Sequence, residues 1–362
     1  MSHALTRFKR TSFVAFGAAV TVGMLATSVL PASASDHRVS APAAGYTVKS
    51  FAAVGAESKP DDITRLGNSI FVAFQNGVGP RGEAAPSGVT SSTIQEYFLD
   101  GRAGKSWQVL GKIDGLTADN ARHRLLLTTN EDGNTHFSTI TPGDVPALKT
   151  YTYSGLTHGG GTDAISVLHG EIVITASAPT NATGPALYRV DLQGTTAKLT
   201  PVLADNATAT AANGATAGAT VTLGLTDPDS NVVVPRSAAR FAGSFMLTAQ
   251  ADLQLIFASH PGTANQKLQV LSVSQPMDDT VFATKRVQTL WITDPVRNTV
   301  DAVTGPFTPG QAISSVTPDT GAAYLAALNL TDGTLTPIKE LAAIQPKGLL
   351  FGQGHGEADS NN

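Results

Sequence analysis

The chain has 362 residues with no Cys, and its formal net charge is −4 at pH 7. The absence of Cys excludes disulfides, thiolate metal sites and thiol nucleophiles. The acidic balance offers no basic face of the kind that nucleic-acid binding requires. Charged residues make up only 14% of the chain, beside 35 Gly and 20 Pro, which indicates a turn-rich β protein.

The N-terminus has the three parts of a secretory signal peptide. Basic residues lie within the first ten positions, an apolar stretch runs from Phe13 to Leu30, and Ala32-Ser33-Ala34 supplies small residues for cleavage. The alternative is an uncleaved membrane anchor, which the cleavage pattern disfavours. No later stretch is long and apolar enough to span a bilayer. The sequence therefore predicts a secreted, extracellular protein with no membrane contact after cleavage, and we expect a monomer.

The remaining chain divides by composition. Residues 1–34 are expected to be the signal peptide, and residues 35–45 form a polar linker with Pro and Ala. Residues 46–351 read as one β domain, and residues 352–362 form a polar tail predicted to be disordered.

A repeated unit organises the β domain, returning about every 50 residues. Each unit opens with an Asp-containing turn and an apolar strand, followed by a tight turn and a second apolar strand. The units begin with "PDDITRLGNSIFVAFQ" at Pro60, "DGLTADNARHRLLLTTN" at Asp114, "TDAISVLHGEIVITAS" at Thr162 and "MDDTVFATKRVQTLWITD" at Met277. Four short strands followed by a restart is typical of a propeller blade. The second strands are almost entirely apolar, which predicts burial on both faces.

Taken in order, the strands support six units and leave one strand over. The first three units are expected between 60 and 203, and a fourth resumes near 232 after an Ala/Thr/Gly-rich stretch, 204–222, interpreted as a long surface loop. A fifth unit is expected over 280–303 and the last from 312 onward. The last unit lacks a strand and the strand over 46–54 is spare, so we predict an all-β, six-bladed β-propeller whose last blade the N-terminal strand closes. Five or seven blades are the alternatives.

Propeller topology would bring distant acidic residues together. The loops that lead into the first strand of each blade lie on one face near the axis, as do the loops between the second and third strands. The acidic residues in these loops include Glu57, Asp61, Asp62, Asp114, Asp163, Asp227, Asp229, Asp278 and Asp279. Carboxylates around one axis could bind a hard cation such as Ca²⁺, and Asp62 is one candidate ligand. The competing interpretation is ordinary turn chemistry, in which Asp caps its own backbone. A ring of carboxylates also repels itself, so something must neutralise it.

His158 is a candidate for proton transfer, and a nearby carboxylate is the other. His158 precedes Asp163 in "HGGGTD", and an imidazole beside a carboxylate can act as a general base. The alternative is a solvated loop histidine without chemistry. The catalytic candidates are therefore His158 and Asp163.

The segments "GAESKPDDITRLGNSIFVAFQ", "DGLTADNARHRLLLTTN" and "GGGTDAISVLHGEIVIT" resemble the blades of SMP-30/gluconolactonase-like and NHL-type six-bladed propellers, in the style of a secreted actinobacterial member. This resemblance covers the mature chain. It implies a divalent cation on the axis, calcium or zinc, held by a Glu, an Asn and an Asp. Glu57 is similar to the Glu and Asp163 to the Asp, whereas Asp114 stands where an Asn is expected.

Two functions are consistent with the sequence. The first is an extracellular binding or interaction module that uses the loop-bearing face for a small molecule or an extracellular partner. The second is a metal-dependent hydrolase of lactones or related esters, in which Glu57, Asp114 and Asp163 hold the cation. The first is favoured here, because the ligand set of the second is imperfect.

Overall fold

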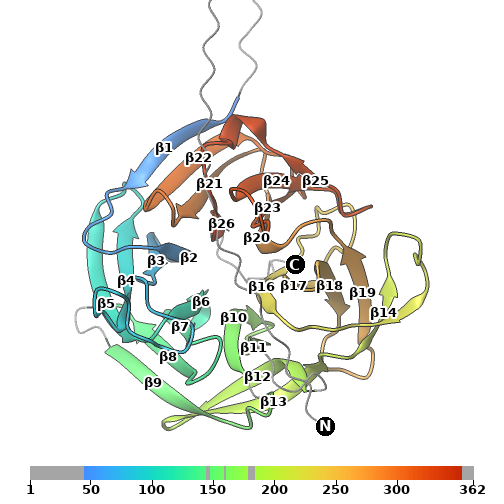
Figure 1. Cartoon of the computed structure of the whole chain (residues 1–362), viewed down its shortest axis with the longest axis horizontal. Helices are drawn as coiled ribbons and strands as arrows, with labels where there is room; N and C mark the ends of the chain where they lie inside the picture. Colours follow the sequence, from blue (N-terminus) through green and yellow to red (C-terminus); the bar gives the residue numbers. More distant parts are fainter. Residues whose placement is uncertain (1–44, 144–146, 159, 178–183, 353–362) are drawn as a thin grey trace, which may run out of the picture. The chain divides into compact units, whose positions relative to one another are not determined.

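The computed structural model describes residues 45–143, 147–158, 160–177 and 184–352. The predicted signal peptide, the linker up to residue 44 and the tail from residue 353 lie outside the described residues. Apart from two short 3-10 helices, η1 (Asn120–Arg122) and η2 (Lys339–Leu341), the regular elements are β-strands. Figure 1 shows the sheets arranged around a common axis, which is a propeller-like all-β fold.

The first three predicted units are found as consecutive antiparallel sets of four strands. The first is a separate sheet of β2 (Pro60–Leu66), β3 (Ser69–Phe74), β4 (Ser91–Phe98) and β5 (Ala103–Leu110). The second consists of β6 (Ile113–Asp119), β7 (Arg124–Thr129), β8 (His136–Thr141) and β9 (Ala147–Ser154). The third consists of β10 (Gly161–Leu168), β11 (Glu171–Ser177), β12 (Pro185–Gln193) and β13 (Thr196–Ala204). The second and third sets join into one eight-stranded sheet, because their outermost strands, β9 and β13, pair in parallel.

The prediction that residues 204–222 form a plain surface loop is wrong. This stretch contains β14 (Thr208–Ala211) and β15 (Thr220–Thr222), which form a hairpin. The hairpin extends a fourth set of four strands through a parallel pairing of β14 with β19. That set consists of β16 (Pro228–Val233), β17 (Phe245–Ala249), β18 (Gln254–Ser259) and β19 (Lys267–Ser272). Thr and Ala side chains are small, but their backbone groups can still complete a sheet edge.

The grouping of strands after residue 277 also differs from the prediction. β20 (Met277–Phe282) pairs with β23 (Ala312–Val316) rather than with the next strand in the chain, and β24 (Tyr324–Leu328) and β25 (Leu335–Pro337) follow β23 outward. The two intervening strands, β21 (Val287–Asp294) and β22 (Thr299–Pro306), belong to another sheet. There β21 pairs with the C-terminal strand β26 (Leu349–Phe351), and β22 pairs with the N-terminal strand β1 (Thr47–Ala52). The last two sets of strands are therefore interleaved along the chain.

The second strands of the sheets are buried on both faces, as their apolar runs predicted. Along β3, Ile70 and Val72 point into the hydrophobic cluster shared with β21, β22 and β26, whereas Phe71 points into the cluster shared with β6 and β7. Successive side chains of a strand face opposite sides. A strand between two neighbouring sheets therefore needs apolar residues at every position, and this explains the unbroken "SIFVAF" run.

Candidate functional site

The innermost strands contact one another in turn around the axis. The contacts run from β2 to β6, β6 to β10, β10 to β16, β16 to β20, β20 to β26 and β26 back to β2. Five of these strands have an irregularity in register near their start. The shifts lie between Pro60 and Ile63, Ile113 and Gly115, Thr162 and Ile165, Pro228 and Ser230, and Met277 and Asp279. Every one of these segments contains an Asp, and a bulge re-aims the side chain that it carries. We call this end of the innermost strands the axial rim.

Hydroxyl groups on second strands link neighbouring sheets at the axial rim. Thr175 of β11 donates from Oγ1 to the carbonyl of Pro228 in β16, at 2.7 Å. Thr128 of β7 donates to the carbonyl of Asp163 in the same way, and Thr293 of β21 donates to that of Asp61. Bulges leave backbone carbonyls without a ladder partner. The Thr side chains satisfy these carbonyls and tie each sheet to the next.

Two glycines permit the close approach of neighbouring backbones at this rim. A Cβ on Gly115 would lie 2.4 Å from the carbonyl oxygen of Asp163, and a Cβ on Gly348 would lie 2.4 Å from that of Asp61. No side chain fits at such distances. Gly115 follows Asp114, and Gly348 follows Lys347.

Lysines compensate part of the negative charge. Lys347 occupies, at the start of the sixth innermost strand, the place that an Asp occupies in the others. Its Nζ forms an ion pair with Asp278 and lies 3.7 Å from Asp61. Lys112 lies 2.7 Å from Asp114 and also pairs with Glu131. These contacts supply the neutralising charge that a ring of carboxylates requires.

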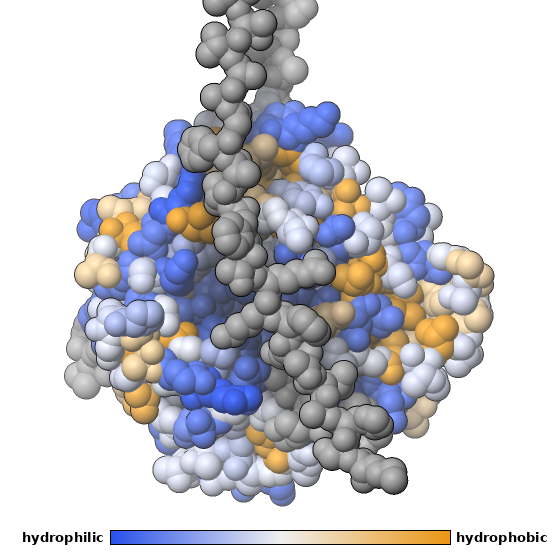
Figure 2. Space-filling view, viewed as in Figure 1, coloured by the Kyte–Doolittle hydropathy of each residue, from blue (hydrophilic) through white to orange (hydrophobic). Residues whose placement is uncertain are grey.

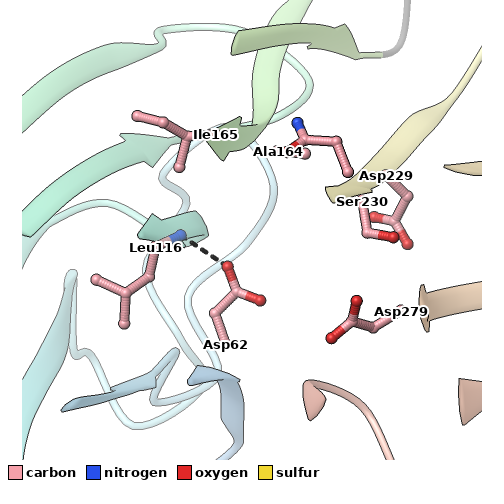
Figure 3. Close-up of a pocket in the computed structure, with 8 residues that line it drawn as sticks. Asp62, Leu116, Ala164, Ile165, Asp229, Ser230 and Asp279 are labelled. Atoms are coloured by element: carbon pink, nitrogen blue, oxygen red, sulfur yellow. Dashed lines mark hydrogen bonds between the residues drawn. The ribbon is translucent and has the colours of Figure 1, made fainter. Parts of the chain in front are cut away.

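Three carboxylates from distant strands meet at one cavity. Asp62, Asp229 and Asp279 line it together with Ser230, and Figure 3 shows their side chains converging. The cavity has a volume of about 30 Å³, room for on the order of two water molecules. Backbone N–H groups already occupy part of the carboxylate surface, because Leu116 donates to Asp62 at 2.7 Å and Leu349 donates to Asp279 at 2.8 Å.

Burial favours the neutral form of these acids. It raises the pKa of Asp114 to about 8, although Lys112 opposes the shift. It raises the pKa of Asp61 to about 6, opposed by Lys347. The same cause raises the pKa of Asp227, beside the rim, to about 6. For three more rim carboxyls burial, reinforced by neighbouring carboxylates, raises the pKa well above the ordinary value: Asp62, Asp163 and Asp229. The rim therefore binds protons at pH values where free Asp is ionised.

The structure brings Asp62, Asp114 and Asp163 to the rim but gives Glu57 other surroundings. The backbone carbonyl of Glu57 accepts from Asn298 Nδ2 at 3.0 Å, in the turn between β21 and β22. With burial as the larger cause, Glu57 also raises the pKa of Tyr97, a β4 residue, to about 12. Neither Asn298 nor Tyr97 lies on an innermost strand.

The residues assigned by resemblance do not fit a metal as a set. Within the described ranges, no group of three or more His, Cys, Asp or Glu side chains is arranged to hold a metal ion. Asp114 is engaged by Lys112 and by the backbone N–H of Glu131. Asp163 keeps one buried oxygen, Oδ2, without a hydrogen-bond partner. Ligation of calcium or zinc by Glu57, Asp62, Asp114 and Asp163 stays a prediction.

His158 is buried rather than solvated, and its assignment to proton transfer with Asp163 stays a prediction. Its side chain is 0% exposed, so it is not a solvated loop residue. Its ion-pair contact is Asp205, which follows β13, and Nε2 lies 3.7 Å from Oδ2 of that residue. The prediction paired His158 with Asp163. The contact with Asp205 arises because the end of β13 lies beside the segment before β10, and no local sequence pattern shows this.

Sequence reasoning missed the lysines and Asp205. A signal for Lys347 existed, because "PKGLL" repeats the Pro-Asp-Asp-Ile pattern of Pro60 with Lys in place of Asp. Lys112 is two residues before Asp114 and carries no pattern of its own. On the uncovered part of the face in Figure 2, hydrophilic residues gather around the hollow near the axis, which agrees with a charged rim.

Comparisons with known proteins give similarities of fold only. Neither protein-family models nor curated proteins match the sequence. A periplasmic gluconolactonase of Pseudomonas aeruginosa, PpgL, is 13% identical, with a TM-score of 0.42, covering 83% of this chain and 90% of its own. A Lactobacillus plantarum protein is 12% identical, with a TM-score of 0.45, covering 83% and 89%. Hydrazine synthase of Kuenenia stuttgartiensis is 10% identical, with a TM-score of 0.41, covering 78% and 69%. Similarities of this size assign neither a family nor an activity.

The search for membrane-spanning helices is also negative within the described residues. None of the helices there has the length and apolar character that crossing a bilayer requires.

Proposed function

We propose that the chain is a six-bladed β-propeller whose last blade is completed by the N-terminal strand, and that it acts outside the cell as a binding module through its axial rim. The contacts of six innermost strands in a closed sequence support the blade number. The pairing of β1 with β22, in the sheet that contains the C-terminal β26, supports the closure. The N-terminal segment supports secretion.

The single observation that carries the binding role is the surplus of carboxyl groups around the two lysines at the rim. Lys112 and Lys347 each contact two carboxylates, and further acids remain without a lysine. Of these, Asp227 and Asp229 are only partly buried. Burial raises the pKa of both acids, and a bound cation favours their ionised form, so binding of a positively charged ligand would be coupled to release of protons from the rim. The proposed ligand is therefore a small molecule or a loop of an extracellular partner that carries positive charge and hydrogen-bond donors.

Calorimetric titration with spermidine, with citrate as the anionic counterpart, tests this role. We expect saturable spermidine binding that weakens as NaCl is raised, because salt screens exposed charges. The double variant Asp227→Asn/Asp229→Asn should weaken binding at least fivefold. Asp191→Asn, an exposed position on β12, is the matched control and should leave binding unchanged. Equal binding of citrate, or no spermidine binding, contradicts the proposal.

Hydrolysis of lactones or related esters is the second candidate. One observation favours it, namely the buried Oδ2 of Asp163 without a partner. The residues proposed as ligands do not fit a cation as a set, so they support no specific reaction step. One cation per chain by elemental analysis, lost in Asp163→Asn together with metal-dependent lactone hydrolysis, would replace the binding role by this activity.

A further inference from the structure

A second polar site lies away from the axial carboxylates, where the connection between β9 and β10 meets the end of β13. His158 and Asp205 face each other there, with exposures of 0% and 3%. Neither His158 nitrogen and neither Asp205 carboxylate oxygen has a hydrogen-bond partner among the described residues. A buried carboxylate without a hydrogen bond or a positive charge is strongly unfavourable. The pair therefore lacks a component.

The separation of the two side chains is longer than a direct hydrogen bond and leaves room for a bridging ion. Nε2 of His158 lies 3.7 Å from Oδ2 of Asp205. A direct N–H···O bond would bring these atoms to about 2.7–3.2 Å. A water molecule bonded to both would hold them about 4.6 Å apart, from two ordinary hydrogen-bond lengths at a tetrahedral angle. A zinc ion at about 2.1 Å from each atom gives 3.7 Å at an angle of about 125°, roughly 15° wider than tetrahedral.

The chemistry of the two groups agrees with this geometry. A neutral imidazole keeps a nitrogen lone pair, and metal binding uses this deprotonated form. Imidazole with a carboxylate suits a divalent transition metal such as zinc better than calcium, which prefers oxygen ligands alone. The described residues supply two ligands here, fewer than the three or four of typical zinc sites, so water or another donor would fill two positions of the tetrahedron.

The backbone positions both groups independently of a metal. The backbone N–H of Asp205 donates to the carbonyl of Gly184 at 2.9 Å, and the backbone carbonyl of Asp205 accepts from the N–H of Leu225 at 3.1 Å. Thr157, beside His158, donates its N–H to the hydroxyl of Tyr188 at 3.3 Å. Leu225 belongs to a hydrophobic cluster together with Leu203, so apolar packing borders the site. These backbone bonds fix the positions of both residues, and an apolar surrounding limits the access of solvent to a site.

We propose that His158 and Asp205 form a binding site for a divalent transition metal ion, separate from the axial rim and from the binding role proposed for it. The site uses the histidine as a neutral nitrogen ligand and the aspartate as the charge-compensating oxygen ligand.

Equilibrium dialysis against zinc chloride tests the site, with metal counted by elemental analysis of the chelator-treated full chain at pH 7.5. The parent protein should retain zinc, and His158→Ala and Asp205→Asn should each lose one equivalent or bind it at least 100-fold more weakly. His169→Ala, an exposed histidine in the turn after β10, should keep the parent stoichiometry. Asp163→Asn should also keep it, which separates this site from the axial rim.

Folding is checked by circular dichroism. If His158→Ala does not fold, the nearly isosteric Asp205→Asn decides. The inference is overturned if the parent takes up no zinc, or if the folded variants keep the full parental stoichiometry and affinity. Neither result affects spermidine binding at the rim, so the two proposals fail separately.

Discussion

The axial rim and the His158–Asp205 site both bury carboxylates, but the chain compensates their negative charge to different extents. At the rim, Lys112 and Lys347 form ion pairs and backbone N–H groups donate to the acids. At the second site, both carboxylate oxygens of Asp205 have no hydrogen bond from the described residues. The comparison teaches that acidity alone does not mark a metal site. Carboxylates that the chain already satisfies are structural, whereas the unsatisfied ones, Asp205 at both oxygens and Asp163 at one, are the candidates for a missing ligand.

Removing a rim lysine should give the largest effect, because it makes the rim resemble the second site. Lys112→Met leaves Asp114 and Glu131 without their cation, and the Asp114 side chain is 2% exposed. Breaking a buried ion pair on one side should destabilise the protein by about 3 kcal/mol. Chemical denaturation measures the loss. Lys198→Met, at an exposed position on β13, is the control. An equal loss in both variants would show that the rim lysine has no special role.

A substitution that crowds the rim backbone without changing a charge tests how much close packing alone contributes to stability. Gly115→Ala places a Cβ 2.4 Å from the carbonyl of Asp163, and overpacking of this kind should cost about 2–3 kcal/mol. Gly143→Ala adds a Cβ with no atom within 4 Å and should be nearly neutral. Denaturation midpoints of both variants decide the matter. A Gly115→Ala protein as stable as Gly143→Ala would mean that the two sheets are not in contact there.

Stability should fall as the pH rises, because of the rim acids. Burial raises the pKa of Asp61 and Asp227 to about 6 and of Asp114 to about 8. The folded state thus holds protons that the unfolded state releases near pH 4, so stability is lost progressively from about pH 4 to 8. The free energy of unfolding should drop by about 2 kcal/mol between pH 5 and pH 8, measured by denaturation at several pH values.

Asp61→Asn should flatten this pH dependence, since it removes one of the titrating groups. Stability that increases between pH 5 and pH 8 would contradict the assignment of protonated acids to the rim.

The smallest effect should come from one hydroxyl that links two sheets at the rim. Thr175→Val removes the hydrogen bond to the carbonyl of Pro228 while keeping the side-chain shape. It leaves a buried acceptor unsatisfied and should cost about 1–2 kcal/mol. Thr200→Val, at an exposed position on β13, provides the comparison. The hydrogen-exchange rate of the β16 amides should rise in Thr175→Val only. An unchanged rate would show that this hydrogen bond does not hold the two sheets together.

Local sequence predicted the first three sets of strands well. Patterns such as "SIFVAF" over β3 and "EIVITAS" over β11 report burial on both faces directly. The Asp residues that begin the innermost strands were also visible, since they recur at the same place in each unit. The site was less predictable. Glu57 matched by sequence position only, and its contacts lie with Asn298 and Tyr97 rather than with the innermost strands.

The sequence by itself determined where strands lie, which of their residues are buried, and which loops carry carboxylates, because these depend on side-chain periodicity within a few residues. Only the tertiary structure decided that β20 pairs with β23, that lysines form ion pairs with the rim acids, and that Asp205 contacts His158. Strand pairing and charge compensation join residues far apart in the chain, and several partners satisfy the same local pattern. The choice among them follows from the packing of the sheets around the axis.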